Sequence, residues 1–281
     1  MPASRRGRTA ARGARSPRRT SARREEEQLQ QARKIQETLL PPPLTALPGV
    51  NVAARFLPSS AVGGDFYDYF TLDDRFLVIY LGDVQGKGLE AAMYGLLVSG
   101  LMRGLHKTGT NPADVITFLN HRLCYRALPG KFCCLNYAAF DLVQRRLLLA
   151  NAGMPFPFLL RQGKLSRLEL GGVPVGIFNP CAYEQLAVDL QPGDRLLLHT
   201  DGVPDSLEGL RPARGDGEEQ LKAFLQARAH ASASGLADGL AHFLQPAAKP
   251  APGRSSTALR RKRRRSGELQ DDATFLVVHL L

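Results

Sequence analysis

The stretch from Tyr80 to Gly88, YLGDVQGKG, constrains the fold of this chain most strongly. It follows a run from Arg75 to Tyr80 whose apolar residues predict a buried strand, and a helical pattern begins near Leu89. Asp83 is therefore expected at the end of a strand, before a glycine-rich turn that opens a helix. Glycines in such a turn permit backbone conformations and close approaches that a side chain would forbid. The stretch predicts a site built from a carboxylate and a tight backbone turn.

Three other segments place aspartate beside glycine or beside an apolar strand. They are Gly63–Asp68 (GGDFYD), Thr200–Gly202 (TDG) and Asp271–Thr274 (DDAT). A single Asp-Gly pair is usually a turn, but several such sites, each next to an apolar strand, predict that the carboxylates converge on Asp83. The candidate acidic residues are Asp65, Asp68, Asp83, Asp201, Asp205, Asp271 and Asp272.

Carboxylates that converge in this way repel one another, so each needs a nearby cation to stay ionised. Oxygen ligands favour hard ions such as Mg²⁺ or Mn²⁺. Two ions about 3.5–4 Å apart can lower the pKa of a bound water and hold a phosphoryl group for in-line attack. The sequence therefore predicts a carboxylate site for two divalent cations, without choosing between manganese and magnesium.

Other sites that a glycine-rich turn could form fit this sequence less well. The spacing from Gly82 to Gly86 is one residue too short for a P-loop, and Gly88 stands where Ser or Thr is needed. The segment Gly86–Ala91 matches G-x-G-x-x-A, but no acidic residue follows about 20 residues later in a second parallel strand. The sequence contains no G-x-S-x-G motif, and its six histidines show no metal-ligand spacing.

The net charge of +11 belongs to two short basic segments. Residues 1–24 carry nine Arg, and residues 254–265 carry six Arg and one Lys, with no acidic residue in either. These 16 charges exceed the net charge, so the rest of the chain is net −5. This argues against a fold that binds nucleic acid, although the basic segments could contact a polyanion weakly and in a salt-dependent way.

The composition indicates a cytoplasmic protein. No run reaches the roughly 18 apolar residues of a membrane span, and no apolar segment follows the charged N-terminus as in a secretory signal. Cys124, Cys133, Cys134 and Cys181 show no C-x-x-C spacing, which favours reduced thiols.

The chain divides into three expected parts. Residues 1–24 predict a disordered Arg-rich tail, residues 25–43 a linker helix stopped by three prolines, and residues 44–281 one folded domain. A disordered basic insertion is expected at about 246–268. The apolar stripe of the helix at 25–40 is short, so the helix must dock on the body or pair with another copy.

The folded domain is expected to be α+β. Strand patterns at 50–57, 65–72 and 75–81 precede helical patterns at 89–107 and 112–128. Further strand patterns cover 132–142, 145–151, 156–161, 165–170, 183–190 and 195–199. Helices are expected at 218–228 and 234–244, before a last strand at 275–281. Runs of strands separated by helix pairs indicate layered antiparallel sheets.

Six motifs in this order resemble the PP2C-like (PPM) serine/threonine phosphatases, most closely the bacterial SpoIIE/RsbU type. They are Gly63–Asp68, Gly82–Gly88 with Ala91-Ala92, Asn151–Gly153, Pro192–Asp194, Thr200–Val203 and Asp271–Thr274. Ile35–Pro41 also resembles the linker helix before that domain. The resemblance implies an αββα sandwich of two antiparallel sheets flanked by helix pairs, with the site at one edge of both sheets.

The resemblance also implies roles for individual residues. Asp83 would bridge both metals, with the Val84 carbonyl as a further ligand, Asp65 as the upstream metal-site aspartate, and Asp201 and Asp271 completing the other metal site. Catalysis would run through Asp83 and Asp65 by metal-activated water. The pair Asp68 and Asp272 would support these ligands from behind.

The implied reaction is hydrolysis of phosphoserine or phosphothreonine. The implied substrate is a STAS-domain anti-anti-sigma protein in a partner-switching pathway, and the linker helix would receive an activating partner or form a self-dimer. The alternative is a catalytically weak or inactive module that binds and sequesters a phosphoprotein.

The sequence departs from the family pattern at four positions. Met154 stands where His is usual, Cys134 where Thr is common, Gln85 for a frequent Ser and Asp205 for a frequent Glu. None is an expected metal ligand. A thioether cannot replace the hydrogen bonds of imidazole, so Met154 is expected to alter substrate contact or rate.

Overall fold

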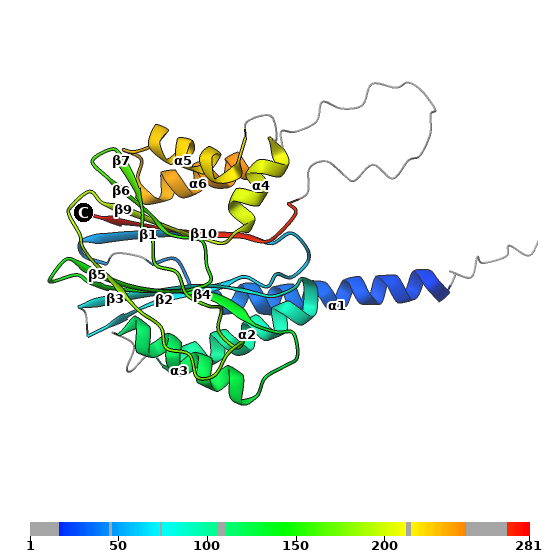
Figure 1. The fold of residues 1–281 in the computed structure, drawn as a ribbon. Helices are drawn as coiled ribbons and strands as arrows, with labels where there is room; N and C mark the ends of the chain where they lie inside the picture. The colour runs from blue at the N-terminus through cyan, green and yellow to red at the C-terminus, as the bar shows by residue number, and fades with distance from the viewer. Residues whose placement is uncertain (1–16, 45–46, 74, 106–110, 212–214, 246–268) are drawn as a thin grey trace, which may run out of the picture.

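Two five-stranded antiparallel sheets lie face to face, and helices cover the outer face of each (Figure 1). The structure, a computed structural model, describes residues 17–44, 47–73, 75–105, 111–211, 215–245 and 269–281. The expected insertion at 246–268 and residues 1–16 of the expected tail lie outside this description.

The strands divide between two sheets, A and B. In spatial order, sheet A contains β1 (Val50–Leu57), β10 (Ala273–Leu280), β9 (Arg195–His199), β6 (Phe158–Arg161) and β7 (Lys164–Arg167). Sheet B contains, also in spatial order, β2 (Phe66–Leu72), β3 (Phe76–Val84), β4 (Cys133–Asp141), β5 (Arg146–Ala152) and β8 (Leu186–Asp189). The predicted α+β sandwich is confirmed.

The helices form the two outer layers. Sheet B is covered by α2 (Gly88–Gly104) and α3 (Pro112–Tyr125), and α1 (Pro17–Leu39) contacts α2 and extends away from the sandwich (Figure 1). Sheet A is covered by α4 (Gly202–Leu210), α5 (Gly217–Ala227) and α6 (Ala233–Leu244). No helix in the described ranges combines the length and hydrophobicity that crossing a bilayer requires.

Successive side chains of a strand point to opposite faces, so the apolar residues form three core layers. One lies between the two sheets, and one lies between each sheet and the helices that cover it. In β3, Val78 and Tyr80 face α2 and α3, whereas Leu77, Ile79 and Leu81 face the other sheet, and all five are fully buried. This explains why β3 reads as an almost continuous apolar run.

Strand register brings the aspartate segments to one edge of the sandwich. In sheet B, Phe66 pairs with Gly82, so the next position along each strand puts Asp65 beside Asp83. Gly82 has no room for a side chain, because an added Cβ would lie 2.3 Å from the Phe66 ring. In sheet A, the Thr200 amide donates to the Thr274 carbonyl at 2.9 Å, which aligns the segments that carry Asp201 and Asp271.

Several expectations about element boundaries were wrong. Helix α1 begins at Pro17 rather than at residue 25, so residues 17–24 are helical; Arg and Glu are good helix formers and Arg23 pairs with Glu27 one turn later. Strand β3 continues through Asp83 to Val84, because β4 pairs with it as far as Cys133. Helix α4 was missed because Gly-Val-Pro-Asp is typical of a turn, so sheet A is covered by three described helices rather than a pair.

Candidate metal centre

Six aspartates gather where the two sheets meet, and we refer to them as the carboxylate cluster. Two come from the sheet B side, one just before β2 and one near the end of β3. Four come from the sheet A side, with one between β9 and α4, one in the first turn of α4, and two just before β10. The members are Asp65, Asp83, Asp201, Asp205, Asp271 and Asp272.

Asp65 is the most deeply buried member of the cluster, at 1% exposed. Its Oδ2 accepts a 3.0 Å hydrogen bond from the Thr200 hydroxyl, which links the two sheets at this edge. Its Oδ1 is also buried but has no hydrogen-bond partner. Burial and the neighbouring Asp83 raise the pKa of Asp65 well above its usual range. A buried, unpaired carboxylate oxygen beside a second carboxylate is the environment that a bound cation would stabilise.

Asp83 lies across the register from Asp65 and is only partly buried. Desolvation, followed by the charges of Asp201 and Asp271, raises the pKa of Asp83 to about 7. Asp83 therefore lies close enough to carboxylates on both sides of the sandwich for their charges to shift its pKa.

The outer members of the cluster are closer to solvent. Partial desolvation and Asp205 raise the pKa of Asp201, and desolvation and Asp271 raise the pKa of Asp205. Asp271 Oδ2 forms an ion pair with Lys87 Nζ at 2.9 Å, and its Oδ1 accepts the Asp272 amide. Lys87 opposes both pKa shifts because its positive charge favours the ionised carboxylates.

Asp272 uses both carboxylate oxygens to hold the loop before β2. Its Oδ1 accepts from the Ser59 amide at 2.7 Å and from the Ser59 hydroxyl at 2.9 Å, and its Oδ2 accepts from the Gly64 amide at 2.7 Å. The side chain is 5% exposed. Asp272 thus positions the loop that ends at Asp65, which agrees with a supporting rather than a ligating role.

Val84 is brought close to the same loop. An ideal Cβ on Gly64 would lie 3.1 Å from the Val84 carbonyl oxygen, so glycine lets the two backbones approach. The carbonyl lies at the end of β3, one residue beyond Asp83.

Asp68 does not join the cluster, contrary to the expectation that it supports the metal ligands. It pairs with Arg103 Nε at 2.7 Å and accepts hydrogen bonds from Tyr80 and the Tyr69 amide. The reason is strand alternation: Asp68 lies in β2 on the face packed against α2. There it anchors Arg103, which also donates to the Leu39 carbonyl at the end of α1 at 2.5 Å.

The cluster fits divalent cations in chemistry. Its candidate ligand atoms are oxygens, and the Asp65 Oδ1 lacks a partner. Desolvation, followed by repulsion between neighbouring carboxylates, raises the pKa values of four members. The described residues nevertheless contain no group of three His, Cys, Asp or Glu side chains positioned to hold an ion as they stand. In this arrangement Asp271 forms an ion pair with Lys87. Closing a coordination shell would require such side chains to reorient.

Two other motifs have structural roles. Asn151 closes the turn after β5 by bonding to the amide and the carbonyl of Met154 at 2.9 and 3.0 Å. The Met154 side chain is 5% exposed and packs in the core between the sheets, so the position where His is usual contributes apolar packing in this chain. Asp194 is buried in an ion pair with Arg161.

Gln36, for which no role was predicted, connects α1 to the loop before Asp65. Gln36 Nε2 donates to the Gly63 carbonyl at 2.7 Å, and the Gly63 amide donates to Gln36 Oε1 at 3.1 Å. A polar residue in the apolar stripe of α1 was the available signal. The loop at 63–64 is therefore held between Gln36 on one side and Asp272 on the other.

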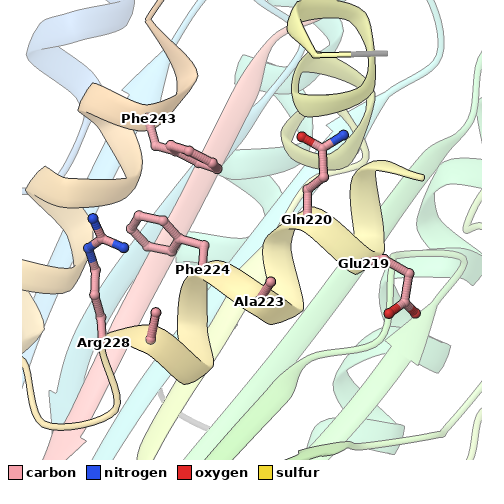
Figure 2. A pocket seen from close by; sticks show the side chains of 7 residues that line it. Glu219, Gln220, Ala223, Phe224, Arg228 and Phe243 are labelled. Atoms are coloured by element: carbon pink, nitrogen blue, oxygen red, sulfur yellow. The ribbon is translucent and has the colours of Figure 1, made fainter. Parts of the chain in front are cut away.

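A separate hollow of about 350 Å³ lies on the helices that cover sheet A (Figure 2). It is lined by Glu219, Gln220, Ala223, Phe224, Ala227, Arg228 and Phe243. Phe224 stacks on Phe243 with ring centroids 5.1 Å apart, and the Arg228 guanidinium lies 4.1 Å from the Phe224 centroid. These groups contact one another, and no cluster carboxylate lines the hollow.

Comparison with known proteins places this fold in a defined group. The model of the family described as stage II sporulation protein E (SpoIIE) matches residues 73–281. Protein IcfG of Synechocystis sp. is 31% identical over 208 residues, which cover 64% of this chain and 33% of that protein. Phosphoserine phosphatase RsbU of Bacillus subtilis is 28% identical over 176 residues, which cover 62% of this chain and 52% of that protein. The chain thus matches about half or less of the length of these curated relatives.

Solved structures show the same fold. The SiaA-PP2C domain of Pseudomonas aeruginosa has a TM-score of 0.76 at 20% identity, covering 95% of this chain and all of that one. The catalytic domain of the serine/threonine phosphatase PstP, in complex with two manganese ions, has a TM-score of 0.56 at 18% identity, covering 83% of this chain and 98% of that one. The predicted PP2C-like architecture is therefore confirmed.

Proposed function

This chain belongs to the stage II sporulation protein E (SpoIIE) family, and on that premise we propose that it is a metal-dependent phosphatase acting on phosphoserine or phosphothreonine of a signalling protein. The observation that carries the proposal is that Asp65 and Asp83 lie side by side at the junction of the two sheets. Asp65 has a buried carboxylate oxygen without a hydrogen-bond partner, and neighbouring carboxylates raise the pKa of Asp83.

We assign the metal ligands as the side chains of Asp65, Asp83, Asp201 and Asp271 with the Val84 carbonyl. Two divalent cations, Mn²⁺ or Mg²⁺, would supply an activated water and charge stabilisation for the phosphoryl group. Asp83 and Asp65 are the catalytic carboxylates, because they lie at the centre of the cluster. Asp272 and Thr200 position Asp65 through the contacts described above. The relative of known structure that holds two manganese ions supports this assignment through its shared fold.

For the substrate, we propose a phosphorylated STAS-domain anti-anti-sigma protein in a partner-switching pathway. The support is the family membership and the relative RsbU, whose name describes it as a phosphoserine phosphatase. We further infer that the protein acts in the cytoplasm, since its four cysteines are free thiols, as expected in a reducing compartment.

We propose that activity is controlled through α1, by an activating partner or by a second copy of the chain. Ile35 and Leu39 of α1 are 59% and 39% exposed, and the neighbouring α2 exposes Leu89, Met93 and Leu97 at helical spacing. A face of this kind is typical of a helix with a missing partner. Gln36 connects the same helix to the loop before Asp65, so a change in α1 would reach the cluster directly.

The alternative is a module that binds a phosphoprotein without turnover. The presence of all four proposed carboxylate ligands argues against it, and the position of Met154 in the core removes the strongest sequence reason for it.

The test is phosphate release from a phosphoserine protein by the purified full-length chain. Release with Mn²⁺ that is lost with EDTA and in Asp83→Asn is expected. If the wild-type protein and Asp83→Asn bind the phosphoprotein equally and neither releases phosphate with Mn²⁺, the binding module is the better account.

A further inference from the structure

Lys87 brings an ammonium group from the glycine-rich turn to the carboxylate cluster. Its Nζ lies 2.9 Å from Asp271 Oδ2 and donates a 2.6 Å hydrogen bond to the Gln270 carbonyl. Gly86 and Gly88 on either side have φ values of +107° and +74°, and Lys87 itself is extended. This turn projects the Lys87 side chain toward the segment that precedes β10.

The charge of Lys87 acts on several carboxylates together. It forms an ion pair with Asp271 and lowers the pKa values of Asp201 and Asp205 against the shifts that desolvation causes. Among the described residues, it is the cation whose ion pair reaches the cluster. Lys131, beside the same turn, pairs with Glu90 instead, at 3.3 Å.

The ion pair between Lys87 and Asp271 can open and allow each group to take another partner, and it adds little to the stability of the fold. The two side chains are 55% and 36% exposed, and pairs this open to solvent contribute little to folding. The flexible stem of lysine can redirect the ammonium while the Gln270 carbonyl keeps it at the rim of the cluster.

We propose that Lys87 is the residue that contacts the substrate phosphate, and that it holds Asp271 until that carboxylate turns to a metal ion. The inference rests on the proposed function, because it takes Asp271 as a metal ligand. An ammonium group and a divalent cation compete for the same carboxylate and repel each other. Once released from Asp271, the ammonium needs a new anion, and a phosphate monoester dianion bound beside the metal ligands provides one.

This role predicts two effects of opposite sign. Removing the Lys87 charge removes a competitor, so metal binding tightens, and it removes a phosphate contact, so phosphate binding weakens. If Lys87 served only to hold the turn against the Gln270 carbonyl, its loss would loosen the site. Metal binding and phosphate binding would then both weaken.

The experiment compares Lys87→Met, Lys87→Arg and the matched control Lys131→Met, which removes the same charge beside the same turn. Calorimetry first measures Mn²⁺ affinity without phosphate, and then the affinity of the Mn²⁺-loaded protein for inorganic phosphate. For Lys87→Met we expect Mn²⁺ to bind several-fold more tightly and phosphate to bind about ten- to a hundredfold more weakly, as for loss of a charged hydrogen bond. Lys87→Arg should recover most of the phosphate affinity, and Lys131→Met should match the wild type.

Weakening of both affinities in a folded Lys87→Met protein, or an unchanged phosphate affinity, would overturn the proposal. Phosphate release by the wild type is measured in parallel. Turnover by the wild type together with unchanged phosphate affinity in Lys87→Met would reject only the role of Lys87. A wild type that neither binds Mn²⁺ nor releases phosphate would reject the proposed function, and this inference with it.

Discussion

The buried carboxylate of Asp272 accepts a hydrogen bond from the Gly64 amide, with 2.7 Å between Asp272 Oδ2 and the amide nitrogen. The two residues are 208 positions apart, and they lie just before strands of different sheets, Gly64 before β2 and Asp272 before β10. Through this contact the segment before β10 fixes the loop that ends at Asp65. The position of one proposed ligand therefore depends on the other sheet.

Replacing Asp272 by Ala should disturb the cluster without removing a proposed ligand. The Gly64 and Ser59 amides would lose their partner, at a cost of about 1–3 kcal/mol in the free energy of unfolding, and Mn²⁺ affinity should fall. Asp216→Ala is a matched control, because Asp216 also accepts a backbone amide, from Glu218, but at the start of α5. Urea unfolding and Mn²⁺ titration measure both effects. Equal Mn²⁺ affinities in the two variants would show that Asp272 does not position the site.

Gln36→Ala should uncouple α1 from the loop before Asp65. The buried Gly63 amide and carbonyl would lose their partners, which should lower the free energy of unfolding by about 1–3 kcal/mol and slow phosphate release. Gln31→Ala, at an exposed position of the same helix, should change neither. The assay is phosphate release at saturating Mn²⁺ with circular dichroism as a check on folding. A folded Gln36→Ala protein with wild-type rates would exclude control of the site through this contact.

Much of this architecture could be predicted from the sequence, because apolar runs and turn residues are local signals. The bounds of β1 and β9 were predicted as observed, and the aspartates at strand ends indicated the cluster. Contacts between distant segments could not be predicted in this way. The partner of Asp68 depends on which face of β2 packs against α2, and the burial of Met154 depends on how the sheets stack. Helix α4 was missed because its short sequence has the local pattern of a turn.

The stability of EDTA-treated protein should fall as pH rises from about 5 to about 8. The pKa of Asp83 is raised to about 7, whereas an unfolded aspartate has a pKa of about 3.9. Between these values the folded protein binds a proton that the unfolded chain has released, so each rise in pH favours unfolding. Melting curves across this range should therefore slope downward, and Asp83→Asn should flatten them. A melting temperature that rises over this range in the wild type would contradict the raised pKa.

Gly202→Ala should test the close packing at the start of α4. A Cβ at Gly202 would lie 1.9 Å from the Asp272 carbonyl oxygen, and backbone cannot move aside cheaply. We expect a loss of about 1–3 kcal/mol or more in the free energy of unfolding. Gly209→Ala in the same helix meets only the flexible end of Gln270, so it should cost much less. Thermal unfolding of both variants provides the comparison. Equal melting temperatures would show that the backbone before β10 can shift to accommodate the added Cβ at little cost.

The most direct measurement of the central claim is an anomalous-scattering map from crystals of this protein soaked in Mn²⁺. We expect two peaks about 3.5–4 Å apart, with Asp83 between them, Asp65 and Val84 on one side, and Asp201 and Asp271 on the other. Lys87 should then have left Asp271. A map with no peak at the cluster under saturating Mn²⁺, or with ions bound only elsewhere on the chain, would contradict the assignment of these carboxylates as a two-metal phosphatase site.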